Sequence, residues 1–220
     1  MTLNIDTPFA YYLGHGIIDD FDFTDIRNEK NIVASERQVR DTKKGQKWVE
    51  DVNTLGVEKF HDKYYRILES HTNLRDNLTN KFKLFLENTY GNLTAKITAS
   101  WITRLEEGDE IAHHKHSNCF YSGLLYFDEE YGVESAALEI KNPLAGMSEI
   151  IVPDWHRKKA CKSMDGITIQ PKTGAYYFFP SICYHSSPFP HVGKPRKSLA
   201  FNFVLDSPLW LFDSSSNPKW

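Results

Sequence analysis

The sequence predicts a mainly β fold that is preceded by N-terminal helices. Before about residue 93 apolar side chains recur at helical spacing, and after it short runs rich in β-branched and aromatic residues alternate with turn residues. Many short strands in one domain favour a sandwich or a barrel. The 220 residues contain no repeat and no long linker, so we expect one domain, with residues 1–92 as helical support and residues 93–220 as the β core.

The helical half is most regular between residues 56 and 90. Its spacing predicts one long or two consecutive amphipathic helices, and Gly91 directly after it is typical of a helix C-cap. The apolar stripe must be covered by another part of the fold. Its members are Phe60, Tyr64, Ile67, Leu68, Leu74, Leu78, Phe82, Phe85 and Leu86.

The β-rich half predicts six strands, separated by residues that favour turns. A long connection, Asn142 to Asp165, contains the cationic stretch WHRKKACK and is expected to form a loop at the rim of the core, where substrate selectivity usually resides. The six predicted strands are Leu93–Thr103, Ser122–Asp128, Ala137–Ile140, Ile167–Gln170, Gly174–Phe179 and Ser198–Leu205.

Charge and composition exclude several classes of protein. The 26 basic and 29 acidic residues give a net charge of −3, which is not the basic footprint of a nucleic-acid-binding protein. No apolar run approaches the roughly 20 residues of a membrane span, and the start lacks a secretory pattern, so we expect a cytoplasmic protein. The three cysteines are widely spaced, and we expect them to be reduced.

Three of the nine histidines fall within four positions, at residues 113, 114 and 116. On an extended strand His114 and His116 face the same side, so both imidazoles can reach one point, with His113 on the other face as a bystander. His185, after the predicted strand Gly174–Phe179, is the candidate third ligand. Imidazole ligands suit iron, copper, nickel or zinc, although a cluster of solvated surface histidines remains the alternative. The other histidines, with no assigned role, are His15, His61, His71, His156 and His191.

Arg196 and Ser198 also stand two apart, on one face of a predicted strand. An inward guanidinium is costly to bury unless an anion pairs with it, so the pair predicts an acidic small-molecule ligand, whereas an outward arginine on an edge strand is the alternative. The turn-rich segment between His185 and Arg196 predicts that these two residues lie on neighbouring strands. A metal with a carboxylate clamp nearby is a layout that suits a chelating 2-oxo acid.

Four motifs carry a resemblance to a known family. They are HKH at residues 114–116, SGLLY at 122–126, TGAYYFFPSICYH at 173–185 and RKSLAFN at 196–202. In this order and spacing they resemble the iron(II)/2-oxoglutarate-dependent dioxygenase superfamily, and more narrowly the small 2OG-Fe(II) oxygenases of marine bacteria and their phages. The resemblance implies a double-stranded β-helix, the jelly roll of cupin-like proteins, as the catalytic core.

The resemblance also implies a role for each motif. The enzyme would use iron(II), 2-oxoglutarate and dioxygen, and would hydroxylate an unidentified amino acid, peptide or small metabolite. Iron ligands would be His114, His116 and His185. Arg196 and Ser198 would hold the distal carboxylate of 2-oxoglutarate.

Tyr126 is expected to donate its phenol to the same carboxylate. The residues support this independently, because Ser122, Leu124 and Tyr126 share one face of a strand. A core tyrosine is the alternative reading.

One position departs from the superfamily pattern. The second ligand is usually a carboxylate, as H-x-D or H-x-E, whereas residue 116 is histidine. A neutral three-histidine face leaves the metal more positive, which favours a chelating dianion, yet it also resembles cupin dioxygenases that use no 2-oxoglutarate. Asp109 or Glu110 is an alternative source of the carboxylate. A jelly-roll binding or structural module without catalysis is the remaining alternative.

Overall fold

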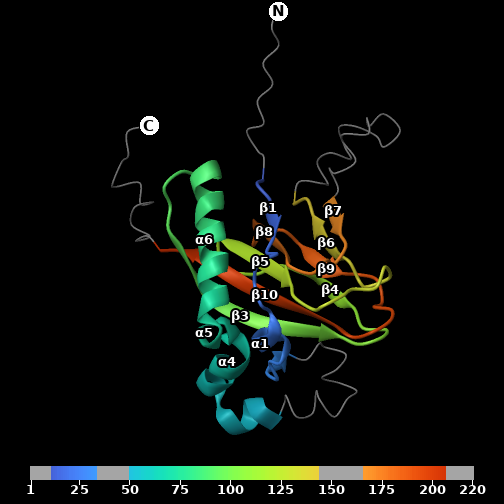
Figure 1. Cartoon of the computed structure of the whole chain (residues 1–220). Coiled ribbons are helices and arrows are strands. Elements are labelled where there is room, and N and C mark those ends of the chain that lie inside the picture. The colour runs from blue at the N-terminus through green and yellow to red at the C-terminus, as the bar shows by residue number, and fades with distance from the viewer. Residues whose placement is uncertain (1–10, 34–49, 144–165, 207–220) are drawn as a thin grey trace, which may run out of the picture.

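The computed structural model describes residues 11–33, 50–143 and 166–206, and its strands form two sheets (Figure 1). The cationic stretch WHRKKACK and most of the predicted rim loop lie outside these residues. The strands are β1 (Gly14–Ile17), β2 (Ile32–Val33), β3 (Ala95–Leu105), β4 (Ile111–His114), β5 (Tyr121–Tyr126), β6 (Leu138–Lys141), β7 (Gly166–Ile169), β8 (Ala175–Pro180), β9 (His185–Ser187) and β10 (Arg196–Leu205).

The two sheets face each other as in a jelly roll, which confirms the predicted mainly β class. One sheet has six strands in the order β1-β8-β5-β10-β3-β2, and the other has four in the order β4-β9-β6-β7. All of their strand pairs are antiparallel except β2 with β3. The six predicted strands are present with ends that shift by no more than two residues. The short strands β1, β2 and β9 were not predicted, because two to four residues carry little periodic signal.

The helical region consists of separate helices that dock on the six-stranded sheet. These are α4 (Val57–Tyr65), α5 (Ile67–Ser70) and α6 (Thr72–Thr89), and the shorter α1 (Thr24–Arg27) precedes them. The expected one or two helices are thus broken further, at Arg66 and His71, whose backbones are not helical. The break at Arg66 lets this residue bridge to Ser100 in β3, whose Oγ accepts a hydrogen bond from the Leu68 N–H at 2.9 Å.

The end of α6 has the predicted glycine geometry. Tyr90 is the C-cap, and Gly91 follows with φ of +90° while its N–H donates to the Leu86 carbonyl at 3.0 Å. This left-handed conformation satisfies a terminal carbonyl and favours glycine. No helix among the described residues is both long and apolar enough to cross a bilayer.

Alternation along β10 divides the six-stranded sheet into two faces. Leu199, Phe201 and Phe203 are fully buried in the main apolar cluster, which includes the stripe of α6. The rings of Phe203 and Phe82 of α6 stack with centroids 3.8 Å apart. The alternate residues of β10, beginning with Arg196, face the space between the two sheets. The helix therefore covers one face of the sheet and leaves the other for a site.

Gly123 of β5 makes room for the ring of Phe201, its partner on β10. A methyl group at residue 123 would overlap this ring, whereas one at Gly132 would meet only the Ser135 hydroxyl, at 3.7 Å. We expect Gly123→Ala to lower the free energy of unfolding by about 1–3 kcal/mol through overpacking. Urea unfolding measures this, with Gly132→Ala as the matched control. Equal stability of the two variants would contradict the packing described.

Candidate active site

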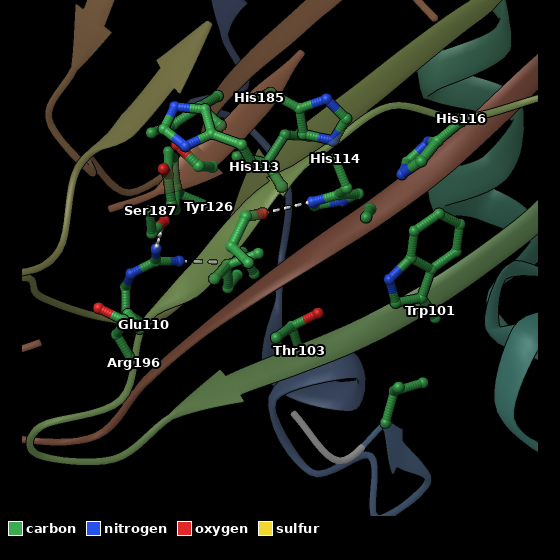
Figure 2. Close-up of a pocket in the computed structure, with 18 of the residues that line it drawn as sticks. Trp101, Thr103, Glu110, His113, His114, His116, Tyr126, His185, Ser187 and Arg196 are labelled. Carbon is green, nitrogen blue, oxygen red and sulfur yellow. Dashed lines mark hydrogen bonds between the residues drawn. The ribbon is translucent and has the colours of Figure 1, made fainter. Parts of the chain in front are cut away.

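A pocket of about 670 Å³ opens between the two sheets (Figure 2). The six-stranded sheet contributes side chains from β3, β5 and β10, and the four-stranded sheet contributes side chains from β4, β6 and β9. The volume falls within the range of roughly 300–1,000 Å³ that is usual for small-molecule sites. Every residue that the sequence motifs single out as a ligand lines it, namely His114, His116, His185, Arg196, Ser198 and Tyr126.

Three histidines meet at one end of the pocket. One ligand atom from each of His114, His116 and His185 lies within 4.8 Å of the others. His114 ends β4, and His185 begins β9 and is its direct partner across the sheet. The ring centroids of these two are 4.3 Å apart, and that of His116 lies 5.3 Å from His114 and 4.8 Å from His185.

The structure corrects how this cluster is built. His116 is not on the same regular strand as His114, because β4 ends at His114. His116 is held in the following segment, where its N–H donates to the Ser181 carbonyl at 3.1 Å. Convergence therefore depends on a turn of the chain and not only on alternation along a strand.

Neither alternative carboxylate belongs to the histidine cluster. Asp109 is buried, and its side chain accepts a hydrogen bond from the Glu106 N–H at 2.9 Å, within the turn between β3 and β4. Glu110 lines the pocket without joining the cluster. His113 lies 3.1 Å from the Glu139 carboxylate and is also outside the cluster, but it lines the pocket and is therefore not turned to the opposite face as expected.

Hydrogen bonds orient two of the imidazoles toward a shared point. His114 Nδ1 lies 2.8 Å from the Ala112 carbonyl, and His185 Nδ1 lies 3.1 Å from the Cys183 carbonyl. A carbonyl oxygen only accepts, so Nδ1 carries the proton in both rings. The Nε2 lone pair of each ring is thereby free to bind a metal ion, which is the usual arrangement of a metal-ligating histidine.

His116 obtains the same orientation from side chains of the opposite sheet. Its Nδ1 lies 2.8 Å from both Asn202 Oδ1 of β10 and Ser122 Oγ of β5. The Ser122 hydroxyl also donates to Asn202 Oδ1, at 3.1 Å. Asn202 was visible in the RKSLAFN motif on the inward face, but only the structure shows that it orients the third imidazole.

Burial lowers the pKa values of two of the imidazoles. Desolvation lowers the pKa of His185 to about 3, and it also lowers the pKa of His116. The neighbouring His114 contributes to both shifts, because one positive charge disfavours another. Both rings are therefore neutral near pH 7, which is the form that binds metal ions. Three oriented imidazoles, of which His116 and His185 are neutral near pH 7, fit a first-row transition metal.

These shifts predict how the stability of the metal-free protein depends on pH. The folded state disfavours protonated His185, so neutral His185 makes its full contribution to the free energy of unfolding above the unfolded-state pKa of about 6.5. That contribution is lost as the pH falls toward the folded-state pKa of about 3. We expect urea unfolding in a chelator to show a decline from pH 7 to pH 5, by at most about 1.4 kcal/mol per pH unit for this residue. His185→Gln should flatten the decline, and a change at exposed His15 should not. An unaltered slope in His185→Gln would contradict the prediction.

The other end of the pocket holds a buried cation, Arg196, which is 3% exposed. Its guanidinium donates to the hydroxyls of Ser198 at 3.2 Å and Ser187 at 3.0 Å (Figure 2). Among the described residues, no carboxylate forms an ion pair with it, and its Nε has no hydrogen-bond partner. Ser187 was not predicted as a site residue, although it stands two residues after His185 and a strand there would have placed both on one face.

Tyr126 lies beside this arginine. Its side chain is fully buried, and its hydroxyl has no hydrogen-bond partner among the described residues. The Arg196 guanidinium lies 5.3 Å from the centre of its ring. Burial raises the pKa of the phenol, which therefore remains a donor. An unpartnered hydroxyl next to an unpaired buried cation fits an anionic ligand that accepts hydrogen bonds from both.

The prediction that His185 and Arg196 lie on neighbouring strands is wrong. β9 belongs to the four-stranded sheet and β10 to the six-stranded sheet, so the two residues face each other across the pocket. The hydrogen bond between Arg196 and Ser187 of β9 connects the sheets. A ligand that reaches from the histidines to Arg196 would therefore lie between the sheets.

Comparisons with solved structures give low similarity in sequence. An oxidoreductase of the 2OG-Fe(II) oxygenase family from Burkholderia pseudomallei aligns with a TM-score of 0.45 and 13% identity, over 61% of this chain and 55% of that one. A prolyl-4-hydroxylase from Pseudomonas putida gives 0.42 and 13%, over 61% and 65%. AviO1 from Streptomyces viridochromogenes Tue57 gives 0.45 and 14%, over 79% and 87%. The chain thus spans less than two thirds of the first two structures.

Among curated proteins, none matches the sequence significantly. A family model described as "Putative 2OG-Fe(II) oxygenase" matches residues 99–202. This range contains the histidine cluster and Arg196 with its hydrogen-bond partners, and the match confirms the resemblance to 2OG-Fe(II) oxygenases that the motifs indicate. Residues 99–202 are therefore similar in sequence to the 2OG-Fe(II) oxygenase family.

Proposed function

We propose that the chain is an iron(II)- and 2-oxoglutarate-dependent dioxygenase. The observation that carries the proposal is the buried guanidinium of Arg196, which forms no ion pair in the described part of the chain and faces the histidine cluster across one pocket. His114, His116 and His185 would hold iron(II). Bound iron(II) and 2-oxoglutarate would together supply the oxidising power, drawn from dioxygen, for hydroxylation of a second substrate.

Arg196 would hold the distal carboxylate of 2-oxoglutarate, with Ser198 and Tyr126 donating to the same group. A guanidinium and a carboxylate form short, charge-assisted hydrogen bonds that compensate for the loss of water around each. Ser187 keeps the guanidinium oriented from the opposite sheet. The anchor residues, meaning Arg196, Ser198, Ser187 and Tyr126, thus select a ligand with an acidic end.

Charge balance supports a dianionic ligand. The histidine cluster contributes no negative charge, so a divalent metal would retain its full charge. The guanidinium adds one more positive charge, and among the described residues that line the pocket the exposed Glu110 is the one carboxylate. A chelating 2-oxo diacid provides one carboxylate for the metal and one for Arg196. A ligand carboxylate would then compensate the positive charge at each end of the pocket, the metal at one end and the guanidinium at the other.

The remaining wall of the pocket would receive the substrate to be hydroxylated. Trp101 and Thr103 of β3 and Val33 of β2 line the pocket beside the anchor residues. The Trp101 ring centroid lies 5.2 Å from that of His116, so this wall adjoins the metal cluster. We infer that an amino acid, a peptide or a small metabolite binds against it.

A second candidate is a three-histidine cupin-type dioxygenase that does not use 2-oxoglutarate. The histidine at position 116 favours it, because the usual carboxylate ligand is absent there. Such an enzyme would have no use for a buried, unpaired Arg196. Undiminished turnover by an Arg196→Ala variant would favour this candidate. If the parent turns over substrate only with 2-oxoglutarate and Arg196→Ala loses that turnover, this candidate is excluded.

Tyr126→Phe tests the anchor without disturbing the fold. The phenol hydroxyl is buried without a partner, so its removal should leave the midpoint of thermal unfolding unchanged or higher. We expect the affinity for 2-oxoglutarate to fall roughly tenfold or more, because a hydrogen bond to a charged group is lost. Calorimetric titration of 2-oxoglutarate into the zinc-loaded protein measures this, with exposed Tyr184→Phe as control. Lower stability with unchanged affinity would show that Tyr126 is only a core residue.

His116→Ala tests the metal cluster. Removing one of three ligands should lower the affinity for iron(II) by at least about 100-fold, whereas His116→Asp should retain a bound metal because carboxylates also bind first-row metals. Anaerobic equilibrium dialysis followed by elemental analysis measures both. His113→Ala is the matched control, because this neighbouring imidazole lies outside the cluster. The assignment is wrong if His113→Ala loses the metal and His116→Ala keeps it.

A further inference from the structure

The anchor residues lie where the strand ladder that supports them ends. Ser198 and Tyr126 are the last pair between β10 and β5, and Arg196 lies beyond that pair, next to Leu105 of β3. The end of a ladder is its least restrained part, because the terminal residues lack neighbours on one side. Another set of contacts must therefore hold the phenol and the guanidinium in place.

Tyr131, in the segment after β5, makes such contacts with both strands. Its ring packs edge-on against that of Tyr126, with centroids 5.4 Å apart and an angle of 73° between the planes. Its hydroxyl accepts a hydrogen bond from the Asp128 N–H at 2.9 Å and donates one to the Lys197 carbonyl at 3.0 Å. The Tyr131 side chain thus joins Asp128, just after the end of β5, to Lys197, next to Arg196 at the beginning of β10.

The Asp128 side chain adds a second connection between the same two segments. Its carboxylate accepts a hydrogen bond from the Lys197 N–H at 2.5 Å. The Thr173 hydroxyl, just before β8, donates to the Asp128 carbonyl at 2.8 Å. This hydrogen bond ties the segment after β5 to the segment before β8. Lys197 Nζ also approaches the carboxylate, at 3.9 Å.

The N-terminal helix α1 covers these connections from outside. Arg27 Nε donates to the Phe127 carbonyl at 2.7 Å, and Lys197 Nζ donates to the Arg27 carbonyl. The described segment 11–33 is therefore tied through Arg27 to the residue after β5 and to the beginning of β10.

We propose that Tyr131 is a positioning residue for 2-oxoglutarate. Together with Asp128 it holds the end of β5 against the beginning of β10, so that Tyr126 and Arg196 already point at the position of the distal carboxylate before the ligand arrives. This inference rests on the proposed function. Without the connection, binding would have to order both side chains and would be weaker.

Tyr131→Phe tests the inference, because it keeps the ring against Tyr126 and removes only the hydroxyl. Calorimetric titration of 2-oxoglutarate into the zinc-loaded protein should show an affinity about three- to tenfold lower, as expected for the loss of neutral hydrogen bonds. The affinity for zinc itself should not change, because the histidine cluster lies at the other end of the pocket. In 2-oxoglutarate-dependent oxygen uptake by the iron-loaded protein, KM for 2-oxoglutarate should rise with little change in kcat.

Tyr177→Phe is the matched control. The Tyr177 ring also lies near Tyr126, with centroids 6.4 Å apart, but its hydroxyl forms no hydrogen bond within the described part of the chain. The Tyr177→Phe variant should bind 2-oxoglutarate with the same affinity as the parent protein.

A second pair of variants keeps the test valid if Tyr131→Phe does not fold. Asp128→Ala removes the acceptor for the Lys197 N–H and should weaken binding, and Asp128→Asn retains an acceptor oxygen and should restore it. Parent-like affinity in Tyr131→Phe, or in Asp128→Ala, would overturn the positioning role. Failure of the parent protein to bind 2-oxoglutarate would instead overturn the proposed function.

Discussion

A buried guanidinium that has no carboxylate partner among the described residues is the constraint on which the candidate site depends. Arg196 is almost inaccessible to water, and within the described residues its hydrogen bonds go only to the neutral hydroxyls of Ser198 and Ser187. Placing a cation there is costly for the free protein unless a ligand completes its environment. The unpartnered Tyr126 hydroxyl lies beside it, so the site has a donor surface for an anion. A metal ion held by the three imidazoles opposite would give that anion a second point of attachment.

The packing of the six-stranded sheet makes this arrangement possible. On β10 alternate residues pack against α6, and the intervening ones face the pocket, so the same strand contributes to the apolar core and to the site. The helix therefore does more than cover an apolar surface, because it fixes the plane from which Arg196, Ser198 and Asn202 project. The four-stranded sheet supplies the opposing wall with His114 and His185. Contacts between sheets, such as Ser187 with Arg196 and Asn202 with His116, then set the distance between the walls.

Alternation along strands was sufficient to predict much of the site. Tyr126, Arg196 and Ser198 follow from residues two apart on one face, and the structure brings them into one pocket. Other features depend on contacts between segments that are distant in the sequence. The orientation of His116 by Asn202 spans 86 positions, and the placement of β9 opposite β10 is a property of topology. The helix break at Arg66 coincides with its bridge to Ser100 of β3, a tertiary contact that a continuous helical pattern does not reveal.

The most direct test of the account is an anaerobic titration followed by visible absorption. Iron(II) is added to the metal-free protein first, and 2-oxoglutarate second. A 2-oxo acid that chelates iron(II) through its carboxylate and oxo groups gives a weak metal-to-ligand charge-transfer band, and we expect this band to appear only after both additions and to saturate at one equivalent of each. Bound iron(II) that gives no band with 2-oxoglutarate would contradict the assignment of Arg196 and the histidine cluster to one dioxygenase site.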